Sequence, residues 1–168
     1  MTLPRNLVLG LCLLASPGLA ARPASSPSLS AADQAAAFRA AGFHREGRSW
    51  HQCERQLRSP SYTPGELESL ADRNGDGLPE AVLVEGGAGC YGNTGTQFTL
   101  VSKQRDGSWK AMTTQLGMAK FLATRGAGGW PDIEVGGPGF CFGVHRWNGR
   151  AYVLHRHQYD GRACRPGR

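Results

Sequence analysis

Apolar residues along the chain follow the rhythm of β-strands in several short stretches. Residues 81–84 are continuously apolar, which predicts a short buried strand over 80–85. Residues 96–103 alternate between apolar and polar side chains and predict a second strand. An Asp-Gly turn at 106–107 then returns the chain into a third strand that begins at 109–112. These elements predict an antiparallel sheet.

Another hairpin is indicated near the carboxyl end by Asn148-Gly149, a pair that favours a two-residue turn. The pair separates a strand predicted for 140–147 from one predicted for 150–157. A two-residue turn would place His145 opposite Tyr152.

One segment has helical rather than strand character. Residues 31–41 are rich in alanine, a strong helix former. Ser30 is a favourable N-cap, and Asp33 lies in the first turn, where a negative charge stabilises a helix. Gly42 is placed to end it. The sequence therefore predicts one N-terminal helix over 30–42.

Residues 1–20 have the pattern of a secretory signal peptide. Arg5 precedes a mostly apolar run over 6–14, and small residues follow around Ala20. The run is shorter than the ~20 residues of a membrane span, and no later run approaches that length. We expect cleavage on export, a linker over 21–29 and a single domain over 30–168. The expected location is the periplasm or the exterior of the cell.

Cysteine usage fits an exported protein. Removal of the signal peptide removes Cys12 and leaves Cys53, Cys90, Cys141 and Cys164. Four cysteines allow three pairings, and chain proximity favours Cys53–Cys90 and Cys141–Cys164. No two of them have the spacing of a CxxC metal motif, so we expect disulfides rather than a thiolate metal site.

Two stretches resemble each other at an offset of about 52 residues, which indicates an internal repeat. Residues 77–90 and 129–141 each place a Gly-containing turn, a short apolar strand and a glycine-rich segment before a cysteine. The chain also has 24 glycines and 10 prolines in 168 residues, which indicates many turns. We predict a mainly β fold, a two-repeat antiparallel β-meander with one N-terminal helix. The repeats would cover about 65–115 and 116–164 and form propeller-blade-like units or a small open barrel.

An acidic loop, DRNGDGLPE at residues 72–80, opens the first of these units. Its carboxylate and amide side chains stand at alternate positions and converge when such a loop coils around a hard cation. The all-oxygen donor set favours Ca²⁺ over Mg²⁺, and the alternative is a pair of metal-free turns. The candidate ligands are the side chains of Asp72, Asn74, Asp76 and Glu80 and the carbonyl of Leu78.

Residues 72–84 resemble the calcium loop and following strand of FG-GAP and VCBS-type repeats. The resemblance implies a Ca²⁺-binding loop between two strands of a propeller-like blade. Residues 129–141, GWPDIEVGGPGFC, resemble a segment of a group of small exported proteobacterial proteins. Residues 148–152 resemble the SGxxY signature of periplasmic lysozyme inhibitors, with Asn in place of Ser.

The charge balance favours an acidic partner. The chain has 19 Lys and Arg against 13 Asp and Glu, a net charge of +6. An exported protein does not normally meet nucleic acid, so an acidic protein or envelope polymer is the expected partner. The sequence contains no GxSxG, HExxH or P-loop motif. The leading hypothesis is an exported, calcium-stabilised, non-enzymatic binding protein.

Two alternatives stay open. A periplasmic inhibitor could insert the turn after Trp147 into the cleft of a peptidoglycan hydrolase. An envelope hydrolase could use Glu80 and Asp132 as its carboxylate pair. The turn residues that would contact a partner are Asn148, Gly149, Arg150 and Tyr152.

Overall fold

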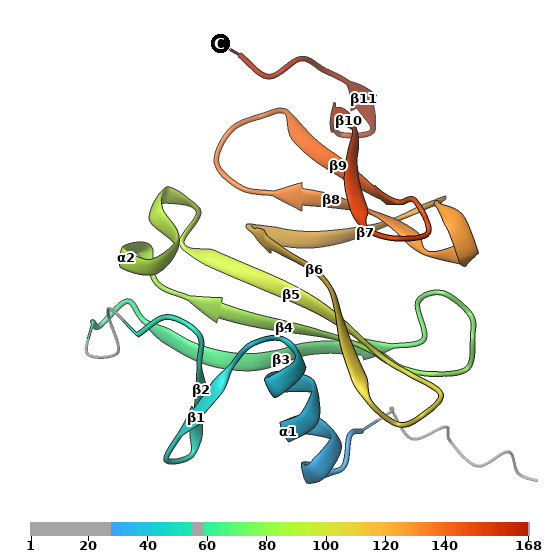
Figure 1. Cartoon of the computed structure of the whole chain (residues 1–168). Helices are drawn as coiled ribbons and strands as arrows, with labels where there is room; N and C mark the ends of the chain where they lie inside the picture. Colours follow the sequence, from blue (N-terminus) through green and yellow to red (C-terminus); the bar gives the residue numbers. More distant parts are fainter. Residues whose placement is uncertain (1–27, 55–58, 168) are drawn as a thin grey trace, which may run out of the picture.

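The computed structural model describes residues 28–54 and 59–167. The predicted signal peptide, Cys12 and residues 21–27 of the predicted linker lie outside the described residues. Two antiparallel sheets with few helical turns make up the fold (Figure 1). This confirms the predicted class, mainly β meanders with one N-terminal helix.

The first helix, α1 (Ala31–Ala40), begins where the sequence predicts. The hydroxyl of Ser30 accepts the Asp33 N–H at 3.0 Å, which caps the helix. Gly42 follows in the left-handed region at φ 88°, a conformation that ends a helix at little cost for glycine. Asp33 also accepts a hydrogen bond from Lys103 at 2.8 Å, which lowers the pKa of Asp33. This contact joins the helix to the first sheet.

The first sheet has six strands that follow one another in space in their chain order. They are β1 (His44–Glu46), β2 (Ser49–His51), β3 (Thr63–Ala71), β4 (Glu80–Gly86), β5 (Thr96–Lys103) and β6 (Trp109–Leu116). In β4, Ala81 and Leu83 pack beneath α1, whereas Val82 packs toward the second sheet. Both faces of β4 are covered, which explains its continuous apolar run.

The second sheet has the strand order β11-β10-β9-β8-β7. Its strands are β7 (Met118–Arg125), β8 (Pro131–Gly136), β9 (Phe142–Trp147), β10 (Tyr152–Tyr159) and β11 (Arg162–Ala163). Short helical turns are α2 (Ala88–Tyr91), η1 (Gly92–Thr94) and η2 (Ala127–Gly129). Strands β3–β6 form one four-strand meander and β7–β10 another. Their relation as a sequence repeat stays a prediction.

A single residue, Gly117, joins the two sheets. It lies between β6 and β7 at φ 126°, and a Cβ there would lie 2.2 Å from the Gly136 carbonyl oxygen. Only glycine fits so close an approach. The facing surfaces of the sheets bury a shared core formed by Val82, Phe98, Leu100, Trp130, Ile133, Trp147 and Tyr152.

The structure contains the two disulfides that chain proximity favoured. Cys53–Cys90 joins the segment after β2 to α2, and Cys141–Cys164 joins the loop before β9 to the segment after β11. Two disulfides are typical of a protein that folds in an oxidising compartment. Among the described residues, no helix has the length and apolar character needed to cross a membrane.

The turn at Asn148-Gly149 differs from the prediction. Trp147, rather than His145, pairs with Tyr152, so the turn holds four residues instead of two. The Asn148 side-chain oxygen accepts two backbone N–H groups inside the turn, each at 2.9 Å. This side-chain bonding stabilises the longer turn and shifts the predicted register.

Candidate functional site

The acidic loop connects β3 to β4 and closes on its own side chains. The carboxylate of Asp72 accepts the N–H groups of Gly75 at 2.8 Å and Gly77 at 2.9 Å. Asn74 accepts the N–H of Asp76 at 2.9 Å, and the side-chain amide of Asn74 donates to the Asp76 carboxylate at 3.0 Å. These hydrogen bonds gather three of the four predicted ligand side chains within one exposed turn.

These side chains fit a calcium ion chemically. Carboxylate and amide oxygens are the hard donors that Ca²⁺ prefers. Asp72 Oδ1 accepts two N–H groups, from Gly75 at 2.8 Å and from Asp76 at 3.2 Å. Asp72 Oδ2 and Asp76 Oδ1 each accept one N–H and keep a free lone pair. Asp76 also accepts the N–H of Leu78 at 2.8 Å, which holds the end of the loop near the other ligands. Within the described part of the chain, no three His, Cys, Asp or Glu side chains are arranged as a metal cluster. The placement of Glu80 explains part of this.

Glu80, the fifth predicted ligand, lies in β4 and is completely buried. Its two oxygens accept the Arg73 N–H at 2.7 Å and the Ser102 hydroxyl at 2.9 Å. Burial raises the pKa of Glu80, although both hydrogen bonds oppose the shift. Glu80 thus holds the base of the loop against β5. To bind a Ca²⁺ ion directly, its carboxylate would have to give up its hydrogen bond to Arg73 or to Ser102.

The same loop packs against the second sheet. Arg125 of β7 donates to the Arg73 carbonyl at 2.9 Å and also to the Gly129 carbonyl. A Cβ on Gly129 would lie 2.7 Å from the Asn74 carbonyl oxygen, so the loop and η2 are in close contact. The Arg73 guanidinium lies 3.7 Å from the centre of the Phe121 ring. An ion that fixed the conformation of this loop would therefore also fix its contacts with β7 of the second sheet and with η2.

Asp132, the other carboxylate singled out in the sequence, is completely buried by polar neighbours. It accepts from Arg146 at 2.9 and 2.8 Å, from Arg156 at 3.0 Å and from Thr124 at 2.6 Å. Burial alone would raise the pKa of Asp132, but the bonds from Arg146, Thr124 and Arg156 hold it well below its usual range. A carboxylate occupied by these donors offers nothing to a substrate, so the geometry gives the hydrolase alternative no support.

The predicted partner-binding turn divides into two parts. Asn148, Gly149 and Arg150 are exposed at its tip. Tyr152 is only 8% exposed, and its hydroxyl donates to the Pro131 carbonyl at 3.0 Å. The structure therefore assigns Tyr152 to the core, a correction to its predicted place on the contact surface.

A buried polar cluster that the sequence analysis missed lies beside the Cys53–Cys90 disulfide. Its centre is Glu85, the last acidic residue of β4, which is almost completely buried. The hydroxyls of Tyr62 and Tyr91 donate to its two oxygens, and the backbone N–H groups of Gln52 and Cys53 add bonds at 3.0 and 3.2 Å. Burial raises the pKa of both tyrosines, and the neighbouring Glu85 raises them further.

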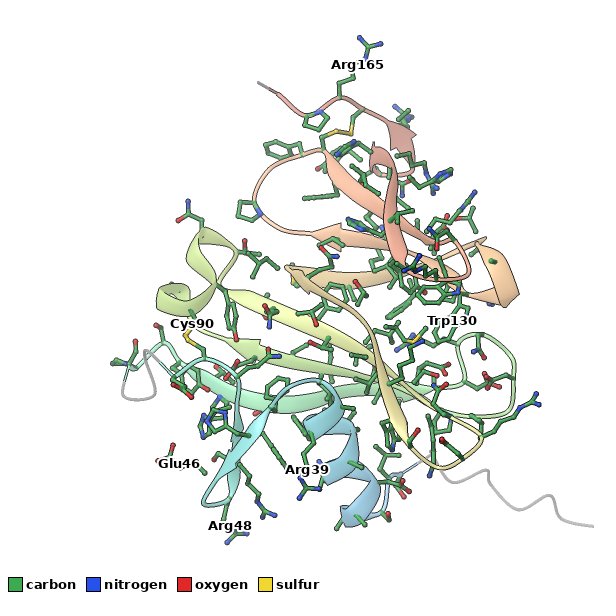
Figure 2. The ribbon with its side chains drawn as sticks, viewed as in Figure 1. Arg39, Glu46, Arg48, Cys90, Trp130 and Arg165 are labelled. Carbon is green, nitrogen blue, oxygen red and sulfur yellow. A yellow bond between two sulfur atoms is a disulfide. The ribbon has the colours of Figure 1, made fainter. Side chains whose placement is uncertain are left out.

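An exposed aromatic surface lies at the other disulfide. Phe140 is 77% exposed, and its ring packs edge-on against Tyr159 with 5.6 Å between the ring centres. The ring centres of Tyr159 and Phe142 are 6.1 Å apart. Tyr159 of β10 lies opposite Arg162 of β11 in the strand register. We call Phe140, Phe142, Tyr159 and Arg162 the C-terminal surface. Arg165 extends from the same end of the molecule (Figure 2).

Comparisons with protein-family models, with curated proteins and with solved structures found no match to this chain. The resemblances to FG-GAP and VCBS-type repeats and to lysozyme inhibitors therefore stay predictions. The function proposed below therefore rests on the contacts, burial and charge of the described residues alone.

Proposed function

We propose that this chain is an exported, calcium-stabilised, non-enzymatic binding protein of the periplasm or envelope. Its partner is an acidic protein that docks on the C-terminal surface. The observation that carries the proposal is the exposure of Phe140. This side chain is 77% exposed, and its loop is held by the Cys141–Cys164 disulfide. A large apolar side chain displayed beside other aromatic rings is typical of an interaction surface.

The composition of this surface favours a protein partner. Aromatic residues and arginine are enriched at the centres of protein interfaces, where a few of them supply most of the binding free energy. Arg162 and Arg165, with the chain's net charge of +6, favour an acidic surface on the partner. The Cys141–Cys164 disulfide limits the motion of the loop before binding, so less entropy is lost on association.

Phe140→Ala is expected to weaken partner binding by at least about tenfold, because hot-spot truncations typically cost about 2 kcal/mol or more. Affinity capture from an envelope extract, with wild type and variant immobilised in parallel, measures the difference. The matched control is Leu116→Ala, since Leu116 is 53% exposed at the end of β6 and lies outside the C-terminal surface.

An acidic protein retained by wild type and by Leu116→Ala, but lost with Phe140→Ala, would support the proposal. Equal capture by all three proteins would contradict it. Retention of an anionic polysaccharide instead of a protein would identify the partner as an envelope polymer and overturn the assignment of partner class.

The calcium proposal rests on the donor set at Asp72, Asn74 and Asp76 and on the contact of their loop with η2. A ligand that binds only the folded state at 100 times its Kd stabilises by about 2.7 kcal/mol. Addition of EDTA is therefore expected to lower the Tm by about 10 °C relative to saturating Ca²⁺. Thermal unfolding followed by circular dichroism measures this shift.

Asp76→Ala should remove the sensitivity to EDTA. Asp160→Asn, which alters an exposed acidic side chain in the turn between β10 and β11, should keep it. Superimposable melting curves for the wild type in Ca²⁺ and in EDTA would count against a calcium-stabilised loop.

A further inference from the structure

A hollow of about 500 Å³ lies between α1, the β1–β2 hairpin and β3. It is at the opposite end of the molecule from the C-terminal surface (Figure 1). One face of α1 forms its helical wall through Ala31, Gln34, Ala35 and Phe38. These positions are spaced as neighbours along a single helix face. The two alanines leave the first turns of this face without large side chains.

Two stacked aromatic rings close the hollow from beneath. Phe38 stacks on Trp50 with 4.9 Å between ring centres and an interplanar angle of 2°. Both rings are almost completely buried, and Leu67 of β3 lines the hollow beside them. An apolar side chain that entered over Ala35 would find packed surfaces already in place.

The rim of the hollow is charged. Arg45 and Arg48 line it from the hairpin, and within residues 28–54 and 59–167 neither forms an ion pair. Arg45 Nε donates to the Gly47 carbonyl at 3.2 Å, which leaves the two terminal guanidinium nitrogens to meet a carboxylate. Figure 2 shows Arg48 at the tip of the hairpin. Glu66 of β3 and Gln34 of α1 add polar groups on the other walls. Two guanidinium groups against one carboxylate leave the rim net positive.

We propose that this hollow binds the carboxyl-terminal end of a peptide whose last side chain is apolar. The terminal carboxylate meets Arg45 and Arg48, since guanidinium groups bind carboxylates with matched geometry. The last side chain packs over Ala35 and Leu67, the half-buried apolar residues that line the hollow. Gln34 and Glu66 supply acceptors and donors for the peptide amides. A fatty acid has the same charge but carries no amide groups that could pair with Gln34 and Glu66, so a peptide is favoured.

The test uses isothermal calorimetry on the intact, disulfide-bonded protein with three probes. These are N-acetyl-alanyl-phenylalanine, the same dipeptide with an amidated carboxyl end, and octanoate. The free acid is expected to bind about tenfold more tightly than the amide, because only the acid forms charge-assisted bonds. The double variant Arg45→Ala/Arg48→Ala should lower affinity for the acid to that for the amide.

A helix variant keeps the test independent of charge. Ala35→Leu should fill the hollow and abolish binding of the acid. Ala32→Leu, on a part of α1 that does not line the hollow, should leave binding unchanged. Equal affinity for acid and amide, no detectable binding of the acid, binding of octanoate alone, or full binding by Ala35→Leu would overturn the proposal. These outcomes do not depend on the C-terminal surface, so this proposal and the proposed function can fail separately.

Discussion

Replacement of Asp132 by alanine is expected to lower the Tm by about 10–20 °C at pH 7. The carboxylate is completely buried and accepts hydrogen bonds from Arg146, Arg156 and Thr124. Its removal leaves two guanidinium groups close together without the shared anion. Loss of one partner from a buried ion pair typically costs about 3–5 kcal/mol. Chemical denaturation with the disulfides intact measures the change in unfolding free energy.

The stabilisation by Asp132 is expected to depend on pH in one direction. The folded pKa of Asp132 lies below its ordinary unfolded value of about 3.9. The stabilisation is therefore fully present above about pH 4 and is lost as the pH falls toward the lower folded pKa. The gap in stability between wild type and Asp132→Asn should be full at pH 7 and smaller at pH 3.

Asp160→Asn is a suitable control for both measurements. Asp160 is exposed and has φ 46°, a left-handed conformation that asparagine also tolerates. This variant should unfold like the wild type at pH 7 and at pH 3. A stability gap for Asp132→Asn that is the same at both pH values would contradict the role assigned to the ion pairs.

Glu85→Ala is the second substitution expected to have a large effect, a loss of about 3–5 kcal/mol in unfolding free energy. The substitution removes the acceptor for the hydroxyls of Tyr62 and Tyr91 and for two backbone N–H groups. Each buried donor left without a partner typically costs about 1–3 kcal/mol. Urea denaturation of the oxidised protein measures the loss.

The hydrogen-bonding origin of that effect can be separated from packing. In a double-mutant cycle, Tyr91→Phe should cost much less in the Glu85→Ala background than in wild type, because its hydroxyl then has no acceptor to lose. Glu54→Ala, at an exposed acidic residue next to Cys53, is the control and should have little effect. Equal losses of unfolding free energy for Glu54→Ala and Glu85→Ala would contradict a stabilising role of the buried cluster.

Short-range signals in the sequence predicted much of the fold. Ser30 caps α1 through its own side chain, so the start of the helix is determined by neighbouring residues. Residues 81–84 are apolar because β4 is covered on both faces. The sequence predicted the position of the Asn148 turn correctly but its length wrongly. The Asn148 side-chain oxygen accepts two backbone N–H groups, and this stabilises a four-residue turn over the two-residue form.

Features that depend on distant residues were not predictable in this way. Strand β3 contains Pro64, Gly65 and acidic residues that locally favour a loop, and its pairing with β4 is what makes it a strand. The partners of Glu85 come from three separate segments that no spacing rule connects. The exposure of Phe140 likewise depends on how Cys141 and Cys164 place its loop. In the acidic loop, the sequence indicated the oxygen donors but not the burial of Glu80.

Neither disulfide of the described residues spans the two halves of the chain. Cys53–Cys90 lies wholly before Gly117, and Cys141–Cys164 lies wholly after it. A polypeptide split at that glycine would consist of two fragments, each retaining its own complete disulfide. Reassembly of such fragments would depend only on noncovalent association between the facing sheets, so the protein is suited to complementation by two separately expressed pieces.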